Sequence, residues 1–354
     1  MKLFSKAFLI AFGLWAFLEA GAHVFFADGI LGRFQYGYNQ TAGWFEHDDR
    51  TELHRVGGAR FRPQTIPKPK PAGTLRLFTA GDSVARGQAL ETAYPYQLGV
   101  VLSHMGTPAE SYNMGIPGYG STRKLILLKQ ALRHDPDLLI LHLHAGNEYE
   151  DELDWNRAQN FRSWHPRNWL MKSFIIARLF QMKEEQVYWT WLSTEIREQS
   201  AVQDEMARIA RQIRDPNSPL LKRWNQRMTR NTERAVNLAL CEGAPMVLVV
   251  PSILDRKAGY SFSDSGLGEQ ARELARRPGV FSYWGAESFR KLKPAEMDPM
   301  FFRDGTHMYP PGHEFFAQQL APVVQQALKS RGALKPQKSR EACEQVLGTL
   351  TPED

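Results

Sequence analysis

A serine early in the chain and an Asp-x-x-His pair near its end are the residues that best fit a chemical role. Ser83 follows Gly81 and Asp82, directly after the apolar stretch 74–80, and Asp304 and His307 stand three residues apart. A hydroxyl, an imidazole and a carboxylate are the groups that a serine nucleophile needs. The set predicts attack of Ser83 on an ester carbonyl, with His307 as the base and Asp304 orienting its ring.

Two further polar motifs follow expected strands and indicate the groups that would stabilise such an attack. Asn113-Met114-Gly115 follows the second expected strand, and 145–148 (Ala-Gly-Asn-Glu) follows the third. In parallel α/β sheets, ligands bind at the carboxyl ends of the strands. We therefore expect the Ser83 and Gly115 backbone N–H groups and the Asn147 side-chain amide to donate to an oxyanion, at about 3–4 kcal/mol each.

The elements that position these residues are read from apolar patterns. Short apolar runs alternate with helical patterns, which predicts a parallel sheet covered by helices on both faces. Ser121 is the expected N-cap of the second helix. Strands are expected at 75–80, 110–113, 137–144 and 246–250, and helices at 94–105, 121–134 and 312–329, with a long helix ending near Cys241.

These motifs together resemble the SGNH hydrolase superfamily, also called GDSL-type esterases, over residues 74–330. The matching stretches are 81–83, 113–115, 145–148 and 304–307. The third stretch departs from the family pattern Gly-x-Asn-Asp, with Ala145 for the glycine and Glu148 for the aspartate. The resemblance implies a flavodoxin-like three-layer α/β/α fold and the site Ser83, Asp304 and His307 with Gly115 and Asn147. It also implies acyl-group hydrolysis or transfer without a metal or organic cofactor.

The N-terminus reads as a targeting segment. Lys2 and Lys6 flank the apolar run 7–18, which is typical of a signal peptide or of an uncleaved signal anchor over 1–31. An uncleaved anchor is favoured because apolar residues resume after Glu19. Either way the body is expected outside the cytoplasm, with the bacterial inner membrane as a partner and the periplasm as its compartment. In an oxidising compartment, Cys241 and Cys343 are either bonded or two free thiols.

The rest of the chain divides by composition. Residues 32–73 are expected to be an extracytoplasmic linker that becomes a stiff spacer at its proline-rich end. A helical insertion rich in tryptophan is expected at about 152–230, as a lid, as a binding wall or as a cap with its own aromatic core. Residues 331–354 are expected to be a peripheral C-terminal tail.

Several other features could suggest a function, but the sequence gives reasons against each interpretation. The net charge of +6 does not by itself indicate nucleic acid, and no Cys/His spacing suits zinc. A metal bound by His142 and His144 lacks a third ligand. His313 is a rival base whose place at the start of a helix suits capping or packing better. The arginines between 208 and 234 suit a solvated helix face better than an anionic partner.

The sequence thus predicts a membrane-tethered serine esterase that removes O-acyl groups, acetyl above all, from an envelope or exported glycan. One alternative is an O-acetyltransferase that uses the same three residues, with a glycan hydroxyl as acceptor in place of water. The other is a non-catalytic glycan-binding protein on a hydrolase fold. Presence of the serine, histidine, aspartate and asparagine together favours an enzyme, because binding alone does not require that set.

Overall fold

The computed structural model describes most of the chain, in two compact units. The described residues are 2–25, 37–38, 40–41, 43–56, 59–162, 173, 175, 218–263, 267–345, 347–348 and 350–352. One unit comprises 1–42, 56–59 and 154–214, and the other comprises 43–55, 60–153 and 215–354. The second unit holds every residue expected to do chemistry.

The first unit contains the N-terminal helix α1 (Lys2–Phe25). Its stretch Ser5–Ala22 is long and apolar enough to cross a membrane. Large apolar side chains of this helix lie open to solvent, with Phe17 76 % exposed. Glu19, which interrupts the apolar stretch, accepts hydrogen bonds from Ser173 Oγ at 2.8 Å and from the Ile175 N–H at 3.2 Å. One apolar helix of this kind fits either a signal sequence or an anchor.

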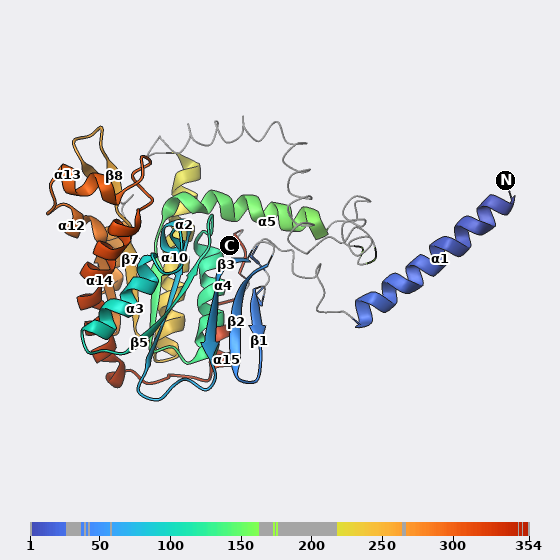
Figure 1. Cartoon of the computed structure of the whole chain (residues 1–354), viewed down its shortest axis with the longest axis horizontal. Helices are drawn as coiled ribbons and strands as arrows, with labels where there is room; N and C mark the ends of the chain where they lie inside the picture. Colours follow the sequence, from blue (N-terminus) through green and yellow to red (C-terminus); the bar gives the residue numbers. More distant parts are fainter. Residues whose placement is uncertain are drawn as a thin grey trace. The chain divides into compact units, whose positions relative to one another are not determined.

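A five-stranded parallel sheet forms the centre of the second unit (Figure 1). Its order is β10-β7-β6-β4-β5, so β4 lies between β5 and β6. Central strands such as β6 and β7 are buried along their whole length, as expected when helices cover both faces of a sheet. The strands are β4 (Leu75–Gly81), β5 (Ala109–Gly115), β6 (Leu138–His142), β7 (Met246–Val250) and β10 (Val280–Trp284).

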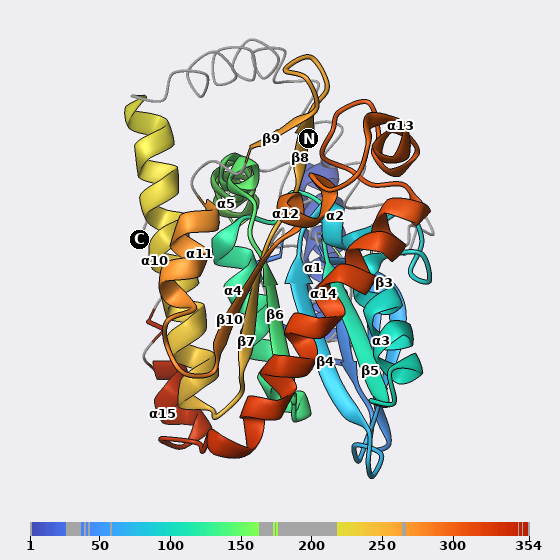
Figure 2. The same ribbon diagram turned by 90° about the vertical axis from the view of Figure 1, so that its left-hand side faces the viewer.

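Helices cover the two faces of this sheet and make three layers (Figure 2). One face carries α3 (Tyr94–His104) and α14 (Pro310–Ser330), which pack on each other and on the sheet. The other carries α4 (Ser121–Ala131), α10 (Pro219–Cys241) and α11 (Leu267–Leu274). The apolar stripes of α3 and α14 meet fully buried sheet residues such as Leu77 and Val247. The expected α/β/α architecture with a central parallel sheet is therefore confirmed.

Shorter elements complete the unit and connect these layers. At the N-terminal side lies a three-stranded sheet of β1 (Trp44–Glu46), β2 (Arg50–Val56) and β3 (Ala59–Pro67), of which β1 and β2 pair antiparallel. The others are α2 (Ser83–Arg86), η1 (Leu132–His134), η2 (Ala145–Asn147), α5 (Glu148–Arg162), β8 (Ile253–Asp255), β9 (Ser261–Ser263), α12 (Gly285–Phe289), α13 (Pro294–Met297), η3 (Asp298–Met300), η4 (Arg331–Ala333) and α15 (Arg340–Gln345).

The structure differs from the sequence expectations at some boundaries. Within the expected linker 32–73, strands β1, β2 and β3 form the small sheet, and they bury Leu53, Phe61 and Ile66. Gly120, not Ser121, is the N-cap of α4. Strand β10 was not expected. Most of the tryptophan-rich stretch lies outside the described residues, so its expected role stays a prediction.

The expected C-terminal tail is tied to the body by several contacts, among them a disulfide and a buried hydrogen bond. Cys343 of α15 forms a disulfide with Cys241 at the end of α10, across 102 residues of sequence. The Pro352 carbonyl accepts a hydrogen bond from Arg227 at 2.6 Å. The sequence left the state of the cysteines open, because spacing gives no distance between thiols. Closing a loop of this length stabilises a folded chain by about 4–5 kcal/mol in the chain-entropy model.

Candidate active site

Ser83 begins α2 at the point where β4 ends. The chain turns directly from strand to helix, and a Cβ at Gly81 would lie 2.3 Å from the Ala85 Cβ, so the turn requires glycine there. Asp82 is the N-cap: its Oδ1 accepts a hydrogen bond from the Val84 N–H at 2.9 Å. This geometry presents the Ser83 hydroxyl at the carboxyl edge of the sheet.

Asp304 and His307 lie on a tight loop between η3 and α14. The Phe301–Met308 bridge closes its base, and the Phe302 N–H donates to the His307 carbonyl at 2.9 Å. Gly305 has a φ of 72°, and a Cβ there would lie 2.0 Å from the Leu254 carbonyl oxygen, so only glycine fits. The Asp304 carboxylate accepts from the Thr306 N–H at 2.8 Å and from the His307 N–H at 2.9 Å.

The structure brings Ser83, His307 and Asp304 into one hydrogen-bonded chain. His307 Nε2 lies 2.9 Å from Ser83 Oγ, and His307 Nδ1 lies 2.7 Å from Asp304 Oδ2. Partial burial raises the pKa of Asp304, but the backbone and ring hydrogen bonds from His307 outweigh it and leave that pKa below its usual range. An ionised Asp304 places a proton on Nδ1 and leaves Nε2 free to accept the serine proton.

These three residues open into a pocket of about 310 Å³. Four of its other lining side chains are apolar, which leaves room for a small acyl group beside the serine. The remaining lining residues are Val84, Arg86, Gly87, Gln88, Pro117, Phe302, Met308 and His313. A pocket of this size falls at the small end of ligand sites.

The expected oxyanion donors differ in availability. Asn147 follows β6, the strand next to β4, and its Nδ2 is buried without a hydrogen-bond partner among the described residues. The Gly115 N–H instead donates to Asn113 Oδ1 at 2.8 Å. Gly118, with a φ of 75°, directly follows the pocket residue Pro117, and within the described part of the chain its N–H has no acceptor. The sequence reasoning did not single out Gly118.

A buried ion pair lies directly behind the serine. Lys124 Nζ donates to Asp82 Oδ2 at 3.0 Å and to the His142 carbonyl at 2.9 Å, and both charged side chains are almost fully buried. Burial raises the pKa of Asp82, but the charge of Lys124 outweighs it and holds that pKa well below its usual range. Sequence reasoning missed Lys124, although a lysine on an apolar helix that packs on the sheet was a usable signal.

His142 and His144 both lie close to Asp82, although β6 ends at His142 and His144 follows it, so the expected strand to 144 is too long. His142 Nε2 is 4.0 Å from Asp82 Oδ1, and His144 Nδ1 is 3.7 Å from Asp82 Oδ2. Burial lowers the pKa of His142 to about 3, so its ring is neutral, and Tyr94 Oη lies 3.0 Å from its Nδ1. Within the described residues, no cluster of three or more His, Cys, Asp or Glu side chains could hold a metal ion.

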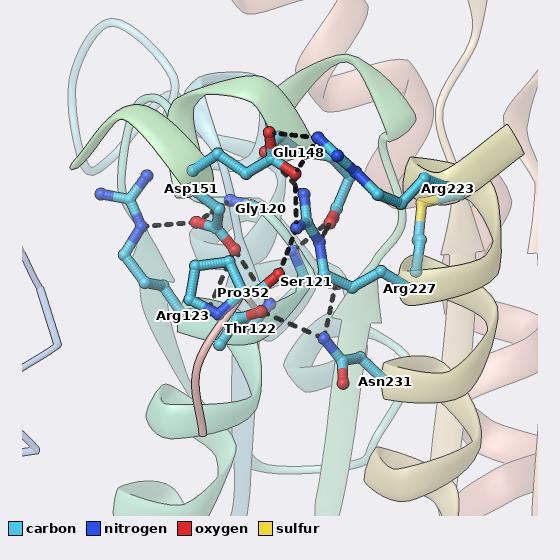
Figure 3. A network of polar contacts seen from close by, with 12 residues as sticks. Gly120, Ser121, Thr122, Arg123, Glu148, Asp151, Arg223, Arg227, Asn231 and Pro352 are labelled. Atoms are coloured by element: carbon cyan, nitrogen blue, oxygen red, sulfur yellow. Dashed lines mark hydrogen bonds and ion pairs between the residues drawn. The ribbon is translucent and has the colours of Figure 1, made fainter. Parts of the chain in front are cut away.

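A second buried network holds the loop that carries Asn147 (Figure 3). Glu148, the next residue, accepts from the Ser121 N–H at 2.7 Å and from Arg227 Nε of α10 at 2.7 Å. Asp151 of α5 accepts from Arg123 Nε at 2.5 Å and from the Gly120 and Thr122 N–H groups. These carboxylates cap α4 in place of the expected Ser121 side chain. Glu148, the departure from the family pattern, therefore joins three helices.

His313, and Arg223 and Arg227 of the basic stretch, bond to other protein groups and do not take part in the Ser83 hydrogen-bonded chain. His313 lines the pocket, but its Nδ1 accepts from the Tyr94 N–H at 3.3 Å, and burial lowers its pKa to about 4. In the basic stretch, Arg227 is buried and paired with Glu148, so a solvated face is wrong at that position. Arg223, exposed, pairs with Glu152. Arg208, Arg211 and Arg214 lie outside the described residues.

Comparison with known proteins gives structural neighbours and no sequence relative. No protein-family model matches the chain, and no curated protein sequence matches it. Among solved structures, TesA matches at 13 % identity over 71 % of this chain and 99 % of its own, with a TM-score of 0.41. A family 3 carbohydrate esterase of Clostridium thermocellum matches at 11 % identity over 73 % and 98 %, with a TM-score of 0.37.

A third neighbour is a member of the lipolytic protein G-D-S-L family from Veillonella parvula. It is 8 % identical over 71 % of this chain and 98 % of its own, with a TM-score of 0.41. At these identities and TM-scores we draw nothing about activity from the matches. The geometry around Ser83 has to support the function by itself.

Proposed function

We propose that this chain is a serine esterase of the SGNH type, with Ser83 as nucleophile, His307 as general base and acid, and Asp304 as the group that orients His307. The observation that carries the proposal is the unbroken hydrogen-bonded chain from Asp304 Oδ2 through the His307 ring to Ser83 Oγ, at 2.7 and 2.9 Å. The first and last members lie far apart in sequence, and a general base within hydrogen-bond reach of a hydroxyl is the geometry that proton transfer requires.

The reaction follows from these contacts in two halves. Ser83 Oγ attacks the ester carbonyl carbon while its proton passes to His307 Nε2. The tetrahedral intermediate collapses, the ester C–O bond breaks, and the leaving alkoxide takes that proton from His307. Water then attacks the acyl-serine as His307 removes its proton, and the same proton returns to Ser83 Oγ when the free acid departs. Asp304, held ionised, stabilises the imidazolium in both halves.

Charge on the tetrahedral oxyanion needs donors at the pocket. We assign the Ser83 N–H, at the N-terminus of α2, and the Asn147 amide, whose Nδ2 is buried without a hydrogen-bond partner among the described residues. Asn147 is not itself among the residues that line the pocket. Gly115, the donor expected from the sequence, would have to release Asn113 Oδ1 first. The Gly118 N–H is the alternative third donor, because it follows Pro117 in the pocket wall and has no acceptor among the described residues.

Two other features support a substrate class and a location. The pocket accommodates a short acyl group such as acetyl, because only Val84, Pro117, Phe302 and Met308 supply apolar surface around the serine. The apolar face of α1 is exposed, which suits lipid, and the disulfide suits an oxidising compartment. We propose an enzyme tethered in the inner membrane that acts in the periplasm on O-acetyl groups of an envelope or exported glycan.

The test uses the full chain in detergent micelles with a fluorophosphonate probe and an aryl acetate. We expect covalent labelling and release of acetate, both abolished in Ser83→Ala. The matched control is Ser330→Ala at the end of α14, which should keep both. Activity that persists in Ser83→Ala, in protein with the wild-type circular dichroism, would place the nucleophile elsewhere.

The same assay separates hydrolysis from transfer to a glycan hydroxyl. An acetyl donor is supplied together with a saturating glycan acceptor, and mass spectrometry locates the acetyl group. An esterase releases it as acetate. An O-acetyltransferase moves most of it to the glycan, and that result would replace the esterase while keeping the same three residues. Binding of the glycan without labelling at Ser83 would instead point to a binding protein.

A further inference from the structure

Arg86 lines the Ser83 pocket, and Arg62 lies against the backbone of two further lining residues, Gly87 and Gln88. Arg86 is on α2, one helical turn after Ser83. Its Nε donates to the Arg60 carbonyl of β3 at 3.2 Å. Arg62, also of β3, donates from Nη2 to the Gly87 carbonyl at 3.1 Å and to the Gln88 carbonyl. The small N-terminal sheet thus brings cationic side chains to the edge of the candidate active site.

The charges of these arginines lie close enough to disfavour one another. Burial, and the positive charges of Arg62, Arg55 and Arg60, lower the pKa of Arg86 to about 10. Like charges that are held together in a partly buried position repel one another and lose hydration, and both effects destabilise the fold. A bound anion would offset this cost. Clusters of this kind are typical of sites that receive an anion.

Arg62 and Arg86 have no carboxylate as an ion-pair partner among the residues that the structure describes. Their hydrogen bonds run to backbone carbonyl oxygens. Arg62 Nε is buried and has no acceptor within the described part of the chain. By contrast, the other arginines near the sheet edge, Arg123 and Arg227, are each paired with a buried carboxylate. The remaining guanidinium donors of Arg62 and Arg86 are left for a ligand.

We propose that Arg62 and Arg86 form an anion subsite that binds a carboxylate of the substrate, so that the enzyme prefers short-chain esters of acidic saccharides. This rests on the proposed esterase function. The planar guanidinium fork matches a carboxylate in two hydrogen bonds. The pocket offers few apolar side chains, so the substrate's acyl part is short. The carboxylate that Arg62 and Arg86 bind therefore belongs to the alcohol part of the ester. An acidic sugar residue has that combination of groups.

The activity test compares two substrates that differ in one charge. The full chain in detergent micelles is given an acetylated glucuronic acid oligosaccharide, or the same oligosaccharide with each carboxylate converted to a primary amide. We expect kcat/KM for the acid to exceed that for the amide by about tenfold, the worth of one or two charge-assisted hydrogen bonds. The ratio should fall toward one in Arg62→Gln/Arg86→Gln, and also in 0.5 M salt.

Conservative and distant variants make the charge dependence specific. Arg62→Lys/Arg86→Lys keeps the charges without the fork and should keep an intermediate preference. Arg276→Gln removes an exposed arginine paired with Glu273 on the surface, and should keep the wild-type ratio. If the double glutamine variant does not fold, the salt dependence of the wild-type ratio and the lysine variant carry the test.

A binding arm decides the subsite independently of turnover. Calorimetry measures the non-acetylated glucuronate oligosaccharide, and its amide, against the Ser83→Ala chain. We expect the acid to bind about tenfold more tightly, and this difference to vanish when Arg62→Gln/Arg86→Gln is added. Preference for the acid without acetate release from any ester by the wild-type chain would overturn the esterase and leave the subsite standing.

Two other outcomes overturn the subsite as proposed. Acetate release that depends on Ser83 but shows no preference for acid over amide, in either arm, leaves the esterase and removes the subsite. An acetyl ester that carries a phosphate serves as the third substrate. If it outcompetes the uronate, and loses that advantage in the double glutamine variant, the subsite binds phosphate and the carboxylate assignment is wrong.

Discussion

Two sets of charged residues meet at the carboxyl edge of the sheet, and they differ in exposure and in what they contact. In the outer set, the Asp304 and His307 side chains are 50 % and 42 % exposed, and the ring contacts the Ser83 hydroxyl. In the inner set, the Asp82 and Lys124 side chains are 0 % and 3 % exposed, and they contact backbone and each other.

The difference shows that the type of a residue does not by itself identify it as a group that reacts with substrate. Both sets combine a carboxylate with a cation or a ring, but the outer set lines a pocket of about 310 Å³, whereas Lys124 of the inner set lines a cavity of about 10 Å³. The inner set fixes the start of α2 and so the position of the hydroxyl. We therefore expect the outer set to control rate and the inner set to control stability.

The largest expected effect tests the outer set. His307→Asn should lower kcat for an aryl acetate by about 10⁴-fold, because no base then accepts the Ser83 proton. His313→Asn, on the same side of the pocket but bonded to the Tyr94 N–H, should lower it by less than about tenfold. Steady-state kinetics of both variants, with matched circular dichroism, make the measurement. A larger loss at 313 would reverse the assignment of the base.

The next effect tests the inner set. Lys124→Met leaves the Asp82 carboxylate buried without its cation, and should lower the free energy of unfolding by about 3–5 kcal/mol. Urea unfolding monitored by tryptophan fluorescence gives the value. Adding Asp82→Asn, which keeps an N-cap acceptor for the Val84 N–H, should restore part of the loss. Full stability in Lys124→Met would show that this pair does not hold α2.

An effect of intermediate size concerns the pH dependence of the free energy of unfolding, to which the buried His313 contributes. Its folded pKa is about 4, whereas an unfolded histidine titrates near about 6.5. As the pH falls from about 6.5 to 4, the unfolded chain binds this proton and the folded chain does not, so unfolding becomes easier by about 3 kcal/mol from this group. Urea unfolding of wild type and His313→Gln across that range should show a shallower pH slope in the variant. Equal slopes would contradict the assignment.

The smallest effect lies within the network of Figure 3. Arg223 is 61 % exposed and pairs with Glu152, so Arg223→Gln should change the free energy of unfolding by less than about 1 kcal/mol. Arg227, buried against Glu148, is the matched comparison, and Arg227→Met should cost several times more. Equal losses in the two variants, measured by urea unfolding, would show that burial does not separate these pairs.

Much of the fold was readable from the sequence because its signals are local. The apolar runs that became β4, β6 and β7 are contiguous, and the helical stripes of α3 and α14 recur with helical spacing. Strand β10 escaped because its Ser282 and the flanking aromatic residues give no clear apolar run. The small sheet at 44–67 escaped because proline and charged residues obscured its alternation.

The candidate site was readable in part. Ser83, Asp304 and His307 were found because glycine-flanked serines and Asp-x-x-His pairs carry their own local pattern. Lys124 was missed because its partner Asp82 is remote in sequence, and the same holds for Arg62, whose contacts reach the loop after α2. Pairings of this kind are set by which strands and helices become neighbours.

The sequence by itself determined the strands β4 to β7 with the helices between them, the apolar N-terminal helix and the residues with reactive side chains, since each depends on spacing along one stretch of chain. Only the tertiary structure decided which of those side chains meet. It joined Cys241 to Cys343, paired Lys124 with Asp82, and buried Glu148 against Arg227. Distances of a few ångströms between remote segments depend on how the layers pack, and no local pattern encodes them.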